Sequence, residues 1–98
     1  MEVTFKNKKL EKICTNVKTA TKKYNEKMAE IITQRIFELR ASETIEDLLQ
    51  FKIGRCHSLK GDRKGQYAMD LLHPQRLIFT VIKNKIQIAN IIEIVDYH

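Results

Sequence analysis

The sequence is poor in residues that break or cross-link a chain. Its 98 residues include one proline, three glycines, two cysteines and no tryptophan. Few glycines and prolines, together with 43% hydrophobic residues, exclude a disordered or low-complexity chain. Cys14 and Cys56 lie far apart and lack a CxxC partner, which excludes the disulfide framework of small secreted domains. We therefore expect two reduced thiols.

Long apolar stretches are also missing. No run approaches the roughly 18 apolar residues of a membrane span. The first residues do not resemble a signal peptide. These absences predict a soluble cytoplasmic protein with no membrane partner. A chain of this length forms one small domain, so we expect a single domain over residues 1–98 and no fold that encloses a large cofactor.

The familiar motifs of cofactor and metal chemistry are absent. There is no glycine-rich nucleotide loop, no HExxH and no GxSxG. The three histidines, His57, His73 and His98, are too far apart for metal-ligand spacing. We expect neither a metal nor a cofactor. Three Tyr and four Phe also argue against a stacking platform for single-stranded nucleic acid.

Positive charge is in excess and unevenly spread. Eighteen Lys and Arg against twelve Asp and Glu give a net charge of +6. Residues 1–27 carry +5, residues 28–51 carry −3 and residues 52–98 carry +4. A small basic domain of this kind predicts an anionic partner, with nucleic acid the leading candidate.

The first half of the chain has helical periodicity. Residues 7–49 contain neither Gly nor Pro. Two apolar stripes recur at three- and four-residue spacing: Leu10, Ile13, Cys14 and Val17, then Met28, Ile31, Ile32, Ile36 and Leu39. We expect Asn16 or Asn25 to interrupt the helices, residues 42–43 to end the second, and Thr44 to cap one further turn.

Beyond residue 50 the period shortens towards that of strands. We expect strands at residues 2–5, 56–59, 66–72, 76–82 and 86–97. Strands joined by such short connections run antiparallel. The predicted fold class is therefore α+β, with N-terminal helices packed on one face of a small antiparallel sheet.

A basic segment begins within the strand expected at residues 56–59. His57, Lys60, Arg63 and Lys64 lie within eight residues, and Gly61 and Gly65 flank the two last. One interpretation is a solvated basic hairpin loop, which most charge runs are. The other is a phosphate-binding loop, in which Arg offers a planar fork and Lys a point charge.

The end of the sequence is the second unusual segment. An apolar strand closes in Asp96, Tyr97 and His98, which are able to move protons or orient a group. Strand alternation places Asp96 and His98 on one face and Tyr97 on the other. Arg76 opens the apolar strand before it, either as an exposed edge charge or as a residue facing the same cleft.

These segments together resemble a known family. The segment RCHSLKGDRKGQY from Arg55, the RLIF strand from Arg76 and the closing EIVDYH from Glu93 are similar to the HigB branch of the RelE/ParE toxin superfamily, also called plasmid maintenance killer proteins. The resemblance covers essentially the whole chain. It implies a RelE-like fold and the toxin of a type II toxin–antitoxin system, a ribosome-dependent endoribonuclease that cleaves messenger RNA and needs no metal.

The resemblance also implies partners and site residues. The partners would be the ribosome, its message and a HigA-like helix-turn-helix antitoxin, with operator DNA bound only through the antitoxin complex. The family's active-site positions fall on His57, Lys60, Asp96, Tyr97 and His98. Charge and placement add Arg63, Lys64 and Arg76 as RNA-binding residues.

The chemistry of RNA cleavage suits these residue types. A base must take the 2′-hydroxyl proton, cations must stabilise the phosphorane, and an acid must protonate the leaving oxygen. Histidine serves as base or acid near neutral pH, and the sequence does not decide between His57 and His98. Two alternatives stay open: a ParE-like gyrase inhibitor of the same fold, and a nucleic-acid-binding module without chemistry.

Overall fold

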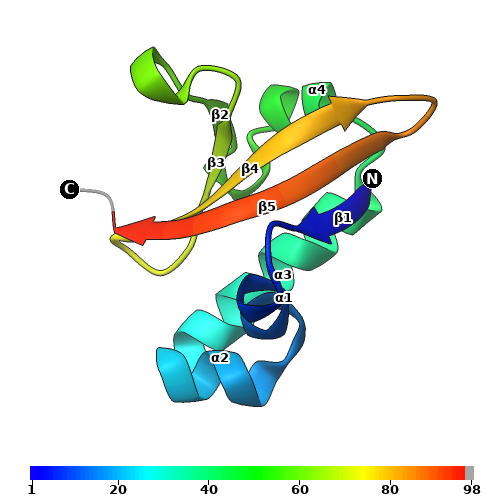
Figure 1. Cartoon of the computed structure of the whole chain (residues 1–98). Helices are drawn as coiled ribbons and strands as arrows, with labels where there is room; N and C mark the ends of the chain where they lie inside the picture. Colours follow the sequence, from blue (N-terminus) through cyan, green and yellow to red (C-terminus); the bar gives the residue numbers. More distant parts are fainter. Residues whose placement is uncertain (97–98) are drawn as a thin grey trace.

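The computed structural model describes residues 1–96 (Figure 1). Its helices are α1 (Lys8–Thr15), α2 (Val17–Lys23), α3 (Glu26–Ala41) and α4 (Ile45–Gln50). Its strands are β1 (Glu2–Phe5), β2 (His57–Ser58), β3 (Tyr67–Asp70), β4 (Gln75–Lys83) and β5 (Gln87–Asp96). Two short 3-10 turns, Ile53–Arg55 and Gly61–Arg63, flank β2.

Polar caps divide the helical half. Asn7, Asn16 and Asn25 precede α1, α2 and α3, and each side-chain oxygen accepts from a backbone N–H of the first turn. Thr44 caps α4 in the same way. The prediction that Asn16 or Asn25 interrupts the helices is confirmed at both positions, because each satisfies donors that a helix start leaves unpaired. Ser42 ends α3, as expected.

The sheet has the strand order β1-β5-β4-β3-β2. β2, β3, β4 and β5 pair antiparallel, as predicted. The prediction of a wholly antiparallel sheet is wrong at one edge, where β1 runs parallel to β5 (Figure 1). Short connections force antiparallel pairing only between strands that follow each other closely in the chain. All the helices and three strands separate β1 from β5, and so long a connection allows the two to pair parallel.

The helices cover one face of the sheet. The main core joins buried residues of α1–α4 to Met69, Leu77, Phe79, Ala89 and Ile91 of the strands. On the opposite face a smaller cluster forms from Ala68 and Ile78, with Leu59 of the β2–β3 connection lying over them. The fold class is thus α+β, with helices on one face. Near β2, the opposite face carries the polar side chains of His57, Asp70 and Arg76.

The described helices do not reach membrane-spanning length. Within residues 1–96, no helix is both long and apolar enough to cross a bilayer.

Candidate functional site

A basic cleft lies beside β2, an edge strand of the sheet. It has a volume of about 570 Å³. Its lining comes from the end of α4, the turn before β2, β2 itself and the start of β4: Leu49, Lys52, Arg55, Cys56, His57, Ser58 and Arg76. Three of these side chains are cations and a fourth is an imidazole, so the cleft suits an anionic ligand.

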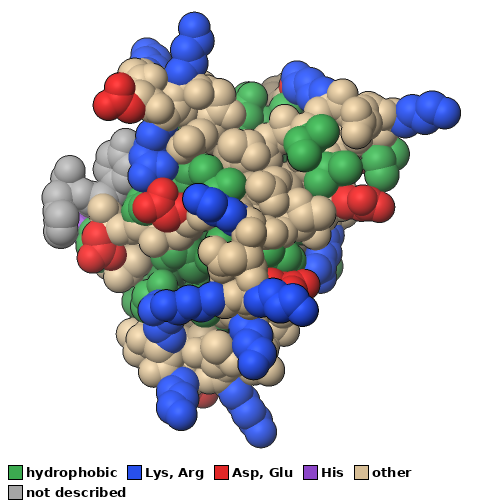
Figure 2. Space-filling model, viewed as in Figure 1, with side chains coloured by type: hydrophobic (Ala, Val, Ile, Leu, Met, Phe, Trp, Pro, Cys, Tyr) green, Lys and Arg blue, Asp and Glu red, His purple; other side chains and the backbone are tan. Residues whose placement is uncertain are grey.

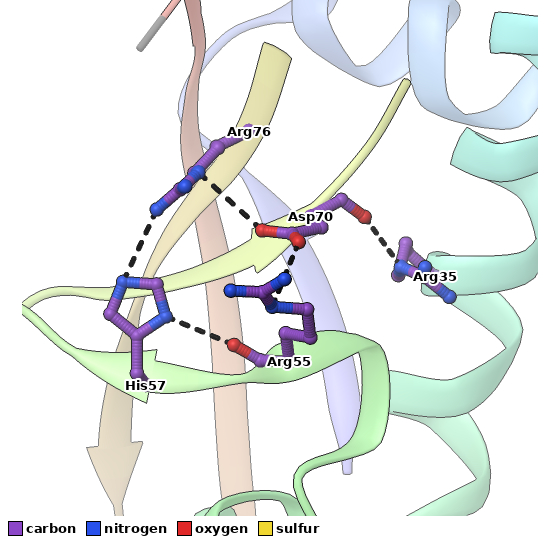
Figure 3. Close-up of polar contacts among 5 residues, drawn as sticks. All are labelled: Arg35, Arg55, His57, Asp70 and Arg76. Carbon is purple, nitrogen blue, oxygen red and sulfur yellow. Dashed lines mark hydrogen bonds and ion pairs between the residues drawn. The ribbon is translucent and has the colours of Figure 1, made fainter. Parts of the chain in front are cut away.

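His57 is held on both ring nitrogens. Its Nδ1 lies 2.9 Å from the Arg55 carbonyl oxygen, and its Nε2 lies 3.5 Å from Nη1 of Arg76 (Figure 3). A carbonyl accepts only and a guanidinium donates only. These two partners fit the tautomer that carries its proton on Nδ1 and turns Nε2 to Arg76.

Asp70 lies between two arginines of the site. Its Oδ2 is 3.3 Å from Nε of Arg55, and its Oδ1 is 3.4 Å from Nε of Arg76. The pairing of β3 with β4 sets Asp70 directly opposite Arg76. Within the described part of the chain, Oδ1 is buried and makes no hydrogen bond, so its contact with Arg76 is one of charge.

The turn before β2 has an unusual backbone. Lys52, Gly54 and Arg55 have φ values of 51°, 59° and 55°, in the left-handed region. Two of the three are not glycine, and each non-glycine residue there costs about 1–2 kcal/mol. This turn directs the Arg55 carbonyl to His57 and the Arg55 side chain to Asp70 (Figure 3).

In the predicted phosphate-binding loop, Arg63 is bonded within the protein, whereas Lys60 and Lys64 are exposed. Arg63 donates to Gln66 Oε1 and Glu93 Oε1, both at 2.9 Å, so its guanidinium ties the loop to β5. Lys60 and Lys64 flank the second 3-10 turn and are exposed. Within residues 1–96 their side chains make no hydrogen bond or ion pair with another side chain. Both remain available to a phosphate.

Asp96 faces the helix side of the sheet. It follows Ile94 by two residues, and Ile94 packs against the main core, so alternation sets both on that face. The Asp96 charge also helps to raise the pKa of Tyr24 in the α2–α3 connection, after burial and the Cys14 charge. His57 pairs with Ala68 of the smaller cluster on the other face. The structure does not bring Asp96 to His57, and Tyr97 and His98 lie outside the described residues.

The two cysteines are chemically quiet. Burial raises the pKa of both Cys14 and Cys56 to about 12, so neither is a thiolate near neutral pH. Cys56 therefore lines the cleft without offering a nucleophile. Residues 1–96 contain no cluster of three or more His, Cys, Asp or Glu side chains suited to a metal ion.

Sequence reasoning missed three residues of this arrangement: Arg35, Arg55 and Asp70. Strand alternation held a signal for Asp70, because it falls two residues after Ala68 and opposite Arg76 across a short turn, where a cross-strand ion pair forms. Arg55 owes its place to a left-handed turn, and Arg35 reaches the site from α3, so no local pattern pointed to either.

Comparisons with known proteins identify the architecture. No family model matches the sequence, and neither does any curated protein. Among solved structures, a YoeB/ParE toxin from Agrobacterium tumefaciens superposes with a TM-score of 0.68 over 100% of both chains, at 16% identity. YoeB of Staphylococcus aureus matches in its complex with YefM (TM-score 0.63) and as a dimer (0.59), each at 24% identity over 100% of this chain and 97% of that one. This chain therefore has the fold of the YoeB/ParE toxins.

Proposed function

We propose that this protein is the toxin of a type II toxin–antitoxin system and a ribosome-dependent endoribonuclease that cleaves messenger RNA and arrests growth. Its fold is that of YoeB and YoeB/ParE toxins, which supports the toxin assignment. The resemblance of LKGDRKGQY and EIVDYH to HigB sequences supports the HigB branch of that superfamily.

One observation carries the nuclease assignment: the Nε2 of His57 faces Nη1 of Arg76 at 3.5 Å in a cleft lined by Lys52, Arg55 and Arg76. In the proposed step Nη1 of Arg76 turns from Nε2 to the phosphate, and Nε2 accepts the 2′-hydroxyl proton while the 2′-oxygen bonds to phosphorus. The three cations stabilise the phosphorane charge. The bond from phosphorus to the 5′-oxygen then breaks, which leaves a 2′,3′-cyclic phosphate. No metal or cofactor enters this step.

The leaving 5′-oxygen needs an acid. With His57 set as the base, we assign this role to His98, on the strength of the HigB resemblance. Tyr97 would stack on a base or donate a hydrogen bond. Asp96 faces the Tyr24 side of β5, on the opposite sheet face from His57, so in this proposal it does not support the base.

Charge outside the cleft supports an RNA-rich partner. Figure 2 shows Lys and Arg side chains gathered at the lower end of the molecule in this view, where Figure 1 places α1 and α2. Others stand at the upper left, at the loop between β2 and β3. In the proposal these two regions bind ribosomal RNA and message by phosphate contacts, in the cytoplasm.

The second proposed partner is an antitoxin. One structural neighbour is YoeB in a YoeB–YefM complex, which supports a dedicated protein partner for a toxin of this fold. The HigB resemblance points to a HigA-like helix-turn-helix antitoxin, through which alone the toxin would meet operator DNA. A gene for such a protein beside this one would support the HigB branch.

The test is induced expression with cleavage of messages mapped by primer extension. We expect the wild type to arrest growth and cut messages only when they are translated. His57→Ala should abolish both effects. His73→Ala is the matched control, because His73 is exposed in the β3–β4 connection and does not line the cleft.

Two outcomes would overturn the nuclease assignment. Growth arrest with intact messages and inhibited gyrase supercoiling would support the ParE-like alternative. Binding to RNA with neither arrest nor cleavage would support a module without chemistry.

A further inference from the structure

We propose that Asp70 is a positioning residue: its carboxylate holds Arg55 and Arg76 by their Nε atoms, and so directs their terminal nitrogens to His57 and the cleft. The reaction that this serves rests on the proposed function. The positioning itself is a property of the isolated chain.

The contact geometry supports this role. Asp70 meets both guanidinium groups at Nε, at 3.3 Å for Arg55 and 3.4 Å for Arg76. Nε and one terminal nitrogen share an edge of the planar guanidinium, so a carboxylate at that edge leaves the other terminal nitrogen facing a different direction. For Arg76 the consequence is visible, because its Nη1 faces Nε2 of His57 at 3.5 Å (Figure 3).

The two contacts are long for charge-assisted hydrogen bonds, which are usually about 2.7–2.9 Å. The carboxylate therefore aligns the arginines without locking them. The Arg55 side chain is 82% exposed and that of Arg76 is 25% exposed. Both can shift towards a phosphate while Asp70 balances their charge, with Arg55 the more accessible of the two.

The backbone of Asp70 is anchored independently of its side chain. Its carbonyl oxygen accepts from Nε of Arg35 at 2.6 Å, and Arg35 in turn pairs with Glu38 on α3. The β3–β4 pairing fixes Asp70 opposite Arg76. A change confined to the carboxylate therefore leaves the strand and its link to α3 in place.

Asp70 differs from Glu93, another carboxylate on this sheet face. Glu93 of β5 lies opposite Ile78 in the sheet and pairs with Arg63 of the loop, away from His57. Asp70 pairs with Arg55 of the turn before β2 and with Arg76 of β4. Both arginines line the cleft, together with Lys52. Glu93→Gln thus removes one negative charge from the same face without touching the arginines of the cleft.

The experiment has two measurements, and the first compares Asp70→Asn with Glu93→Gln. The first uses NMR of the isolated protein and follows the Nε–H signals of Arg55 and Arg76 and the imidazole nitrogens of His57. We expect Asp70→Asn to move the arginine signals and to weaken the signature of a proton fixed on Nδ1 of His57. Glu93→Gln should leave these signals as in the wild type and move those of Arg63.

The second measurement is cleavage of a message on purified ribosomes. We expect Asp70→Asn to lower kcat about 10- to 100-fold, the scale of a misplaced catalytic group, with a smaller change in KM. Asp70→Glu should recover part of the loss, because it restores the charge.

Unchanged arginine and His57 signals in Asp70→Asn would overturn the positioning role. Moved signals together with a wild type that cleaves no RNA would overturn the proposed function and leave the positioning role standing. If Asp70→Asn does not fold, the NMR comparison passes to Asp70→Glu, whose displaced carboxylate must move the same signals.

Discussion

Gly54 and Arg35 are packed so closely that a Cβ on Gly54 would lie 2.8 Å from Nε of Arg35 and 2.9 Å from its Cδ. Gly54 has a φ of 59°, in the region that disfavours side chains. The same Arg35 Nε donates to the Asp70 carbonyl. One glycine thus lets the turn before β2 approach the arginine that ties β3 to α3.

Gly54→Ala should therefore destabilise the protein by about 2 kcal/mol or more, from left-handed strain and from displacement of Arg35. It should also lower message cleavage, because the turn carries Arg55. Gly61→Ala is the matched control: φ is 64° there, but nothing lies within 4 Å of its Cβ position. Urea unfolding of both variants separates strain from contact, and equal losses would contradict the packing argument.

Arg63 distinguishes loop positioning from phosphate binding. Its ion pair with Glu93 is partly exposed, so Arg63→Ala and Glu93→Gln should each cost less than about 1 kcal/mol of stability. If Arg63 serves mainly to hold the loop, both variants should slow message cleavage by similar factors and speed amide exchange over residues 60–66. A much larger cleavage defect in Arg63→Ala alone would favour direct phosphate contact.

Lys60 and Lys64 are expected to bind phosphate directly. For each phosphate that Lys60→Ala or Lys64→Ala no longer binds, the dependence of log affinity on log salt should become shallower by about 0.7. Ribosome sedimentation at several salt concentrations measures this slope. Lys85→Ala, in the β4–β5 turn, serves as the control with the same charge change. Equal slopes for all variants would remove the loop lysines from the interface.

The buried thiols predict a loss of stability in alkali. Burial raises the pKa of Cys14 and Cys56 to about 12, while a thiol in the unfolded chain ionises near 9.0. Below pH 9 both states are protonated and the thiols add no pH dependence. Between pH 9 and 12 the unfolded chain loses protons that the native state keeps, so stability falls by about 1.4 kcal/mol per pH unit for each thiol. Cys14→Ala should make the curve shallower, and an unchanged slope would refute the argument.

Removal of Tyr97 and His98 should abolish cleavage of messages and growth arrest, since the HigB resemblance places active-site residues there. The far-ultraviolet circular dichroism should stay that of the wild type, so that the loss of activity is separated from a loss of fold. Growth assays at matched expression make the measurement. Arrest by the truncated protein would exclude a catalytic role for the terminal pair.

Local sequence patterns were enough to predict the helix boundaries and most of the strands. Asn16, Asn25 and Thr44 sit where helices begin, because a side-chain oxygen there satisfies backbone donors that nothing else reaches. The direction of β1 was not readable in this way. It depends on which strand β1 meets after the whole chain has folded, and no local period encodes that.

The site likewise contains residues that local patterns predicted and residues that only the folded chain brings together. His57 and Arg76 were found from the basic segment and the strand start, and the structure brings them together in one cleft. Asp70, Arg55 and Arg35 were missed because their roles arise from cross-strand pairing, a left-handed turn and a contact with a distant helix. Asp96, which the HigB resemblance makes an active-site residue, lies on the Tyr24 side of β5, on the opposite sheet face from His57.

The parallel pairing of β1 with β5 sets an order on folding during synthesis. β5 lies between β1 and β4 in the sheet, and among the described elements it is translated last. Residues 2–5, made first, must wait for residues 88–91 before they gain a partner. Glu93, which anchors the basic loop, arrives even later. A nascent chain that has not yet reached β5 therefore lacks both its finished sheet and the anchor of its basic loop.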